Sequence, residues 1–181
     1  MATPVLNFKF GRRSLALQRE MADDLAFVMH KALTGFTTVD FGYTQAIRTI
    51  EQQRVNVKTK KSKTMNSRHI PYVPVTPHKY PRAKPIEGPL AHAVDIMAYI
   101  NGKGTWKASA YYEIAQAVRL VAIRYDVAIR WGGCWQDLRK VKDIRQAVDA
   151  YIERCKRANK KPLIDLCHYE LAAASYPKKV A

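Results

Sequence analysis

The sequence predicts one α+β domain in which helices pack on one side of a small, mostly antiparallel sheet. A chain of 181 residues with 48% apolar residues has the size of one domain and can bury a sizeable core. Segments with the apolar periodicity of amphipathic helices alternate with short segments rich in β-branched and aromatic residues. No stretch approaches the ~20 apolar residues of a membrane span.

The first third of the chain predicts a helix, a strand and a second helix. Ser14 is a suitable N-cap for a helix that runs to about Leu33, and Gly35 would end that helix. Residues 37–43 are β-rich and predict a strand. The segment from residue 44 to about residue 55 predicts the second helix, with Arg48 near its start.

The rest of the chain begins with a proline-rich segment. Six prolines between Pro71 and Pro89 exclude a helix or a central strand there. After it, apolar patterns predict a strand over residues 91–98, a helix over 109–125, a short strand over 127–130, a helix from 138 to about 157 and a last strand over 163–171.

The charge of the chain is strongly positive. Lys and Arg number 31 against 15 Asp and Glu, which gives a net charge of +16. Such a balance favours a polyanionic partner, which can be nucleic acid, an anionic lipid surface or cell-wall material. No acidic residue occurs from Gln52 to Ile86, where the basic residues are Arg54, Lys58, Lys60, Lys61, Lys63, Arg68, Lys79, Arg82 and Lys84. A solvated loop that happens to be basic explains this stretch equally well.

The cysteines and the N-terminus indicate an intracellular origin. Cys134, Cys155 and Cys167 lack the Cys-x-x-Cys spacing of metal sites, and we expect free thiols. The first residues lack the apolar core of a signal peptide. We therefore expect the chain to stay in the cytoplasm of the cell that makes it until something releases it.

Two histidines and two carboxylates lie in short motifs that together could form a hydrolytic zinc site. Ser67-Arg68-His69 supplies one histidine, Asp95 lies in a predicted strand, and Asp165 stands three residues before His168. A hydrolytic zinc site needs about three protein ligands, an open position for water and a base beside that water. Taken singly, either histidine is more typical of a hydrogen-bonded core or surface residue.

Six segments occur in an order that is typical of one family. They are Phe8–Ser14, Val39–Gly42 with Ile47-Arg48-Thr49, Lys61–His69, Ala91–Ile96, Ile129–Gly133 with Trp135, and Asp165–Leu171. In this order they resemble the phage L-alanyl-D-glutamate endopeptidases (endolysins), zinc metallopeptidases of the VanY-like D-alanyl-D-alanine carboxypeptidase group. Each segment alone is a weak signal, but six in the correct order are a strong one, and they span most of the chain.

The resemblance implies a Zn²⁺ site at the sheet, held by His69, Asp95 and His168. His78 and His92 remain alternatives to His69, because the proline-rich segment separates His69 from Asp95. On a strand, His92 and Asp95 would point to opposite faces, and the Ser-x-His motif favours His69.

The resemblance also implies two catalytic residues. Asp165 would take a proton from the attacking water and pass it to the leaving amine, and Arg48 would stabilise the oxyanion. A surface ion pair is the alternative role for Arg48. Because Asp165 and His168 would face opposite sides of a regular strand, we expect a bulge or turn around Leu166-Cys167.

The chain departs from the family pattern at three places. Within one peptidase domain over residues 1–181, we interpret residues 70–90 as a proline-rich insertion and residues 138–161 as an additional helix. Cys134 replaces the aspartate of the family's Gly-Gly-Asp-Trp turn. Any contact that the aspartate makes in the family would be absent here.

The expected function is therefore peptidoglycan hydrolysis. We expect a monomeric zinc endopeptidase that cuts the L-Ala–D-Glu bond of the stem peptide and binds the anionic cell envelope, with no nucleic acid as partner and no membrane span. It would be made in the host cytoplasm and act on the periplasmic peptidoglycan after release. A D-Ala-D-Ala carboxypeptidase or dipeptidase of the same group and a non-enzymatic, basic nucleic-acid-binding protein are the alternatives.

Overall fold

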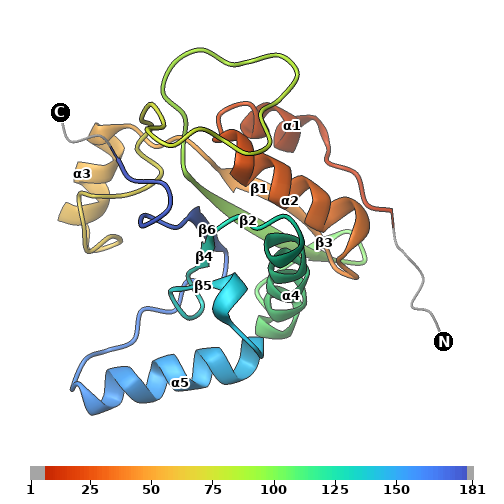
Figure 1. Cartoon of the computed structure of the whole chain (residues 1–181). Helices are drawn as coiled ribbons and strands as arrows, with labels where there is room; N and C mark the ends of the chain where they lie inside the picture. The colour runs from red at the N-terminus through yellow and green to blue at the C-terminus, as the bar shows by residue number, and fades with distance from the viewer. Residues whose placement is uncertain (1–6, 179–181) are drawn as a thin grey trace.

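The computed structural model describes residues 7–178 and confirms the α+β class. A six-stranded sheet has the order β1 (Asp40–Gln45), β2 (Ala93–Ile100), β6 (His168–Leu171), β4 (Ile129–Trp131) and β5 (Gln136–Asp137), and β3 (Lys103–Thr105) also pairs with β2. All five strand pairs are antiparallel. The helices are α1 (Arg12–Gln18), α2 (Asp23–Gly35), α3 (Ile50–Lys58), α4 (Ala108–Arg124) and α5 (Ile144–Arg157), and a 3₁₀ turn covers Leu138–Lys140 (Figure 1).

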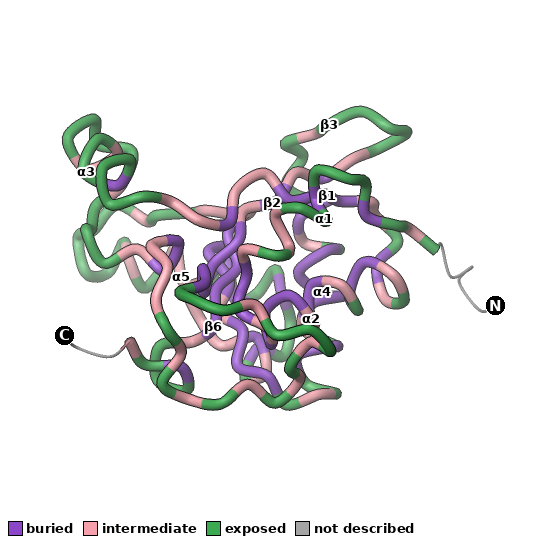
Figure 2. Tube along the Cα trace, turned by 90° about the horizontal axis from the view of Figure 1, so that it is seen from above, coloured by how far each residue is buried: buried purple, intermediate pink, exposed green. Residues whose placement is uncertain are grey.

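One face of the central sheet is apolar and forms the core. Val94 on β2 pairs directly with Tyr169 on β6, and both are buried on this face. Figure 1 shows α2 and α4 on this side of the sheet, and Figure 2 shows the buried trace gathered along the central strands. Fully buried side chains of the two helices include Leu25, Met29, Leu33, Ile114, Val118 and Val121. Burial of each such side chain stabilises the fold by about 1.5–3 kcal/mol.

The opposite face of the same strands is polar. Asp95 on β2 lies directly opposite His168 on β6, and Glu170 lies opposite Arg130 on β4. Directly opposed residues of antiparallel strands project from the same face, and so do residues two apart on one strand. These four side chains therefore share one face of the sheet. Helix α3 lies on this side, away from α2 and α4 (Figure 1).

The single helix predicted over residues 14–33 is wrong, because the chain forms α1 and α2 with a break between them. At the break the backbone pairs with Ala91, whose carbonyl accepts a hydrogen bond from Ala22 N–H at 2.8 Å. Ser14 makes no cap hydrogen bond, and its Oγ accepts one from Tyr43 N–H at 3.0 Å instead. Tertiary pairing has overridden local helix propensity here.

The helix predicted over residues 44–55 begins later than expected. Strand β1 continues to Gln45, and α3 begins after Thr49, which forms a capping box with Gln52. Arg48 therefore lies in the connection between β1 and α3 and not in the helix.

Two predictions in the C-terminal third also need correction. The helix predicted over residues 138–157 is divided into the 3₁₀ turn and α5, because the Asp143 side chain caps α5 by accepting a hydrogen bond from Gln146 N–H at 2.8 Å. Of the strand predicted over residues 163–171, only the last four residues pair in the sheet, as β6.

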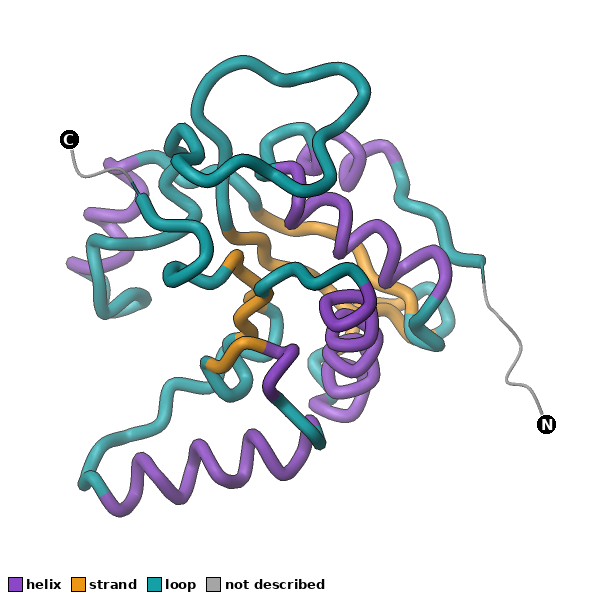
Figure 3. The backbone as a smooth tube through the Cα atoms, viewed as in Figure 1, coloured by secondary structure: helices purple, strands orange, loops and turns teal. Residues whose placement is uncertain are grey.

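Residues 59–92 connect α3 to β2 without a helix or a named strand, as the prolines predict (Figure 3). Asp24 on α2 is fully buried and fixes this connection. Its carboxylate accepts hydrogen bonds from the N–H groups of Lys79 and Tyr80 at 3.0 and 2.8 Å, and from Tyr176 Oη at 2.6 Å. Within residues 7–178, the helices are too short or too polar to cross a membrane.

Candidate metal centre

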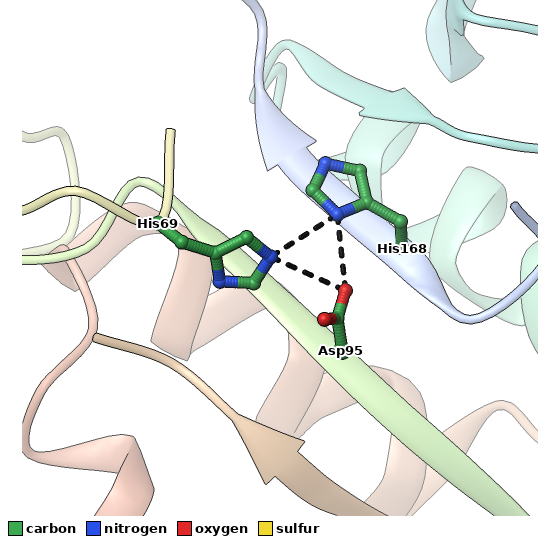
Figure 4. Close-up of side chains that lie close together, drawn as sticks. All are labelled: His69, Asp95 and His168. Atoms are coloured by element: carbon green, nitrogen blue, oxygen red, sulfur yellow. Dashed lines mark hydrogen bonds and ion pairs between the residues drawn. The ribbon is translucent and has the colours of Figure 1, made fainter. Parts of the chain in front are cut away.

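His69, Asp95 and His168 converge on the polar face of the sheet (Figure 4). Asp95 Oδ1 lies 3.2 Å from His69 Nε2 and 3.0 Å from His168 Nδ1. The two ring nitrogens are 3.2 Å apart. Two of the three residues are placed by the direct pairing of β2 with β6, and the third comes from the long connection before β2.

The backbone on both sides fixes His69 in this connection. Arg48 N–H donates a hydrogen bond to His69 O at 3.0 Å, and His92 N–H donates one to Arg68 O at 2.9 Å. The His69 ring is fixed as well, because its Nδ1 donates to Ala46 O at 2.7 Å. His69 as a whole is only 1% exposed. The surrounding atoms therefore hold its ring in one orientation.

The outer nitrogen of each imidazole determines which nitrogen faces the centre. His69 Nδ1 bonds Ala46 O, and His168 Nε2 lies 3.1 Å from Glu170 Oε2. Such partners hold the ring and leave the other nitrogen for a metal. Assigned from these partners, His69 Nε2 and His168 Nδ1 are the nitrogens that could bind a metal, and both face Asp95.

This donor set fits a metal ion. Ligand atoms at 2.0–2.1 Å from a tetrahedral zinc ion would be about 3.3 Å apart. The three observed separations of 3.0–3.2 Å are close to that value. Two imidazole nitrogens and one carboxylate oxygen, with a further position left for water or substrate, match catalytic zinc sites. His69, Asp95 and His168 could therefore hold a metal ion.

The electrostatics of the centre favour a cation. Burial opposes the charge of Asp95, but hydrogen bonds from His168 and His69 outweigh burial and hold the pKa of Asp95 well below its ordinary value. Burial also opposes a charged His168, yet hydrogen bonds to Asp95 and Glu170 raise the pKa of His168 to about 10. Binding of a metal ion at His168 Nδ1 must displace the proton there.

Arg48 stands beside the centre. Its Nη2 lies 3.6 Å from Asp95 Oδ2, and the Arg48 side chain is only 14% exposed. Gln53 Oε1 accepts a hydrogen bond from Arg48 Nη1 at 2.9 Å, and Gln45 Oε1 accepts one from Arg48 Nε at 3.0 Å. Two glutamines therefore hold the guanidinium at the metal group, and Arg48 is not a surface ion pair.

Asp165 reaches the same cleft through a turn. Leu166-Cys167 forms the expected turn, and His168 N–H donates a hydrogen bond to Asp165 O at 3.3 Å. The Cys167 thiol donates to Asp165 Oδ1 at 3.1 Å. Burial, with the charges of Asp165 and Asp95, raises the pKa of the Cys167 thiol, so the thiol stays protonated as a donor.

The turn between β4 and β5 packs against the backbone of Asp165 and holds it in place. Asp165 N–H donates a hydrogen bond to Gly132 O at 3.1 Å. A Cβ on Gly132 would lie 2.3 Å from Asp165 O, so only glycine permits this approach. The indole N–H groups of Trp131 and Trp135 donate to the carbonyls of Leu166 and Leu163 at 2.9 and 2.7 Å. The two tryptophans thus anchor the segment that carries Asp165.

His78 and His92 have other environments. The His92 ring stacks on Tyr72 with a centroid distance of 3.7 Å, and its Nδ1 donates to Leu90 O at 3.1 Å. Burial lowers the pKa of His92 to about 3. His78 Nδ1 lies 3.5 Å from Asp24 Oδ2. The structure therefore brings His69 to Asp95 and His168, whereas His78 lies beside Asp24 and His92 stacks on Tyr72, outside the metal group.

Two residues that support the centre were not predicted. Glu170 Oε2 binds His168, and Glu170 Oε1 accepts a hydrogen bond from Arg130 Nη1 at 3.1 Å. Glu170 could have been found, because it follows His168 by two residues on one strand and must share its face. Arg130 depends on the pairing of β4 with β6, for which the sequence has no local signal.

The metal group lies in a cleft of about 1220 Å³ whose lining is strongly basic. The lining cations are Arg48, Lys60, Lys61, Lys63, Arg68, Arg130, Arg154 and Lys178, whereas the lining acids are Asp95, Asp165 and Glu170. The volume suits a ligand of peptide size. The excess of positive charge favours an anionic ligand.

Comparisons with family models and with solved structures found similarity to peptidases. The family model described as phage L-alanyl-D-glutamate peptidase matches residues 6–153, a range that contains His69 and Asp95 and ends before His168. The crystal structure of the L-Ala D-Glu endopeptidase ChiX of Serratia marcescens matches with a TM-score of 0.64 and 26% identity. This match covers 93% of this chain and 92% of that chain. A search of curated proteins found no match.

Proposed function

Because the chain belongs to the phage L-alanyl-D-glutamate peptidase family, we propose that it is a zinc-dependent endolysin. It cuts the L-Ala–D-Glu bond of the peptidoglycan stem peptide and thereby lyses the host cell wall. It is made in the host cytoplasm and acts on periplasmic peptidoglycan after release. The likeness to an L-Ala D-Glu endopeptidase over nearly the whole chain supports the choice of this bond over D-Ala-D-Ala.

One observation carries the proposal. His69, Asp95 and His168 come from three separate segments, and their donor atoms meet within 3.0–3.2 Å. A cluster of three ligands with fixed tautomers, in a cleft of peptide size, is the arrangement that a catalytic zinc site requires.

The positions of the surrounding residues support the roles that we propose for them. A bound zinc ion would supply Lewis acidity to the scissile carbonyl and to the attacking water. Asp165 lines the cleft and takes the proton of the water, which it then gives to the leaving amine of D-Glu. Arg48, held by its two glutamines beside Asp95, donates to the oxygen that becomes negative as the carbonyl becomes tetrahedral.

The lysines at the end of α3 and directly after it serve adsorption to the anionic cell envelope. Lys58, Lys60, Lys61 and Lys63 are all exposed. Exposed charges are screened beyond about 8 Å at physiological salt. Hydrolysis of intact sacculi should therefore fall as salt rises, whereas hydrolysis of a short stem peptide should fall much less. Equal salt sensitivity of the two substrates would reject the adsorption role.

Two segments are additions to the family's common core. Residues 70–90 pair with no named strand and are held by Asp24, and α5, within residues 138–161, buries only Ile144, Ala147 and Val148. Neither segment supplies one of the three candidate ligands.

The new chain ends produced in purified sacculi test the cleaved bond. Mass spectrometry should find free L-Ala carboxyl and D-Glu amino groups. New D-Ala termini would instead assign the carboxypeptidase activity. No new termini at all, together with tight nucleic-acid binding, would assign the basic binding protein.

Metal analysis of the purified protein tests the centre. The wild type should hold about one zinc ion per chain, and His168→Ala should hold almost none, because two remaining ligands form an inadequate site. His30→Ala is the matched control, since His30 lies on α2 and outside the metal group. Wild-type zinc content in His168→Ala would refute the assignment of the centre.

A further inference from the structure

Arg68 is a buried cation that lacks an acidic partner. It is 7% exposed and lines the cleft one residue before His69. Its Nη2 donates to the carbonyl of Tyr176 at 2.8 Å, and its Nε has no hydrogen-bond partner. Among residues 7–178, no carboxylate forms an ion pair with Arg68. A buried guanidinium without a compensating anion is unfavourable, so a bound anion would stabilise Arg68 in this position.

Lys178 brings a second cation to the same place. Its Nζ donates to Ser67 O at 2.8 Å, and no ion pair of Lys178 occurs in the described part of the chain. Lys178 Nζ and the Arg68 guanidinium lie 5.0 and 5.4 Å from the centre of the Tyr72 ring. Burial, followed by the charge of Arg68, lowers the pKa of Lys178. The two cations therefore act on each other and share one electropositive pocket.

The one nearby acid is already engaged. Glu170 is close enough to affect both cations, but its two oxygens bind His168 and Arg130. Arg68 and Lys178 thus remain uncompensated on the Glu170 side of the metal group, whereas Arg48 lies on the Asp95 side. An anion bound at Arg68 and Lys178 would sit in the same cleft, beside the segment that carries His69.

We propose that Arg68 and Lys178 form a subsite for the free carboxylate of the D-Glu residue on the leaving side of the scissile bond. This inference rests on the proposed function. A glutamyl residue within a linear stem peptide uses one carboxyl to continue the chain and keeps the other free. That carboxylate is close to the amide that is cut, and the subsite therefore makes the enzyme specific for D-Glu over the same residue with a carboxamide.

The test compares two stem peptides that differ only in this group, one with the D-Glu carboxylate and one with the carboxamide. The zinc-loaded wild type should cut the carboxylate peptide with a kcat/KM roughly tenfold to a hundredfold higher, because a charge-assisted hydrogen bond is replaced by a neutral one. Lys178→Met should lower this ratio at least about fivefold, and Lys178→Arg should restore much of it.

Arg154→Met is the matched control. Arg154 is another cation of the cleft lining, but it lies on α5 over Tyr151. The Arg154→Met substitution should leave the ratio of kcat/KM between the carboxylate and carboxamide peptides unchanged. An equal loss in Arg154→Met and Lys178→Met would mean that the total charge of the cleft, and not a subsite, sets the preference, and it would overturn the proposal.

A binding measurement separates the subsite from the cleavage reaction. Calorimetric titration of the metal-free full-length protein should show tighter binding of the carboxylate peptide, and Lys178→Met should remove most of the difference. Equal binding of the two peptides to the wild type, or equal cleavage of both, would refute the subsite. Failure to cut either peptide would refute the proposed function, and the titration would still decide the subsite.

Discussion

Glu170→Gln is expected to weaken metal binding without removing a ligand. In the wild type, Glu170 Oε2 accepts the hydrogen bond of His168 Nε2, and Oε1 accepts that of Arg130 Nη1, both at 3.1 Å. Glutamine has the same shape and keeps one acceptor oxygen, but it has no charge. His168 then becomes a less basic ligand with a less defined orientation.

The size of the effect follows from the class of contact. Loss of a residue that orients a ligand typically costs tenfold to a hundredfold in metal affinity. A factor of ten corresponds to about 1.4 kcal/mol, so the cost is roughly 1.4–2.8 kcal/mol. Arg130 also loses its carboxylate, but its side chain is 40% exposed and can turn to solvent, so that ion pair adds little.

The assay is a competition titration of the metal-free protein with zinc and a chromophoric chelator of known affinity. Glu113→Gln is the control, because Glu113 is exposed on α4 and the same chemical change occurs away from the centre. Arg130→Gln should lower zinc affinity much less than Glu170→Gln does. Unchanged affinity in Glu170→Gln would refute the reasoning that this carboxylate orients His168.

Four other changes test neighbouring parts of the structure. Asp165→Asn should keep zinc but lower hydrolysis about a hundredfold or more, as measured by zinc content and peptide turnover; loss of zinc would assign a ligand role instead. Gly132→Ala should also keep zinc and lower hydrolysis, because the added Cβ would displace Asp165; wild-type turnover would contradict this. Asp24→Ala should cost about 3–5 kcal/mol in urea unfolding, since three donors lose a buried acceptor, whereas the exposed Asp149→Ala should cost under about 0.5 kcal/mol. For His92, the folded-state pKa of about 3 is below the ordinary 6.5, so the stability from neutral His92 is present above pH 6.5 and is lost as the pH falls towards 3. Between pH 6.5 and 4.5, the free energy of unfolding of His92→Phe should therefore fall less than that of the wild type. Parallel plots of unfolding free energy against pH for the two proteins would contradict this.

Local sequence patterns predicted the fold class and the family. Apolar periodicity placed the helix over residues 109–125, observed as α4, within one residue at each end. The prolines excluded a helix or a central strand between residues 71 and 89, and the odd spacing of Asp165 and His168 predicted the turn at Leu166-Cys167. These predictions succeeded because each rests on the backbone preferences of a few neighbouring residues.

Tertiary pairing decided what local patterns could not. The helix over residues 14–33 was broken because Ala91, far away in the sequence, accepts a hydrogen bond from Ala22 N–H and donates one to Glu20 O. Residues 163–167, predicted as part of the last strand, do not pair in the sheet because the indole N–H groups of Trp131 and Trp135 bind the carbonyls of Leu166 and Leu163. Such contacts join distant segments and leave no periodic signal in either one.

The candidate centre shows the same division. The sequence by itself determined which residue types were available as ligands, because imidazole and carboxylate groups stood in recognisable motifs. The Ser-x-His motif favoured His69 over His78 and His92, but only the tertiary structure brings His69 to Asp95 and His168 and holds His168 through Glu170 and Arg130. The reason is physical: the direct pairing of Asp95 with His168 is a property of strand register, and register is fixed by burial of the opposite face.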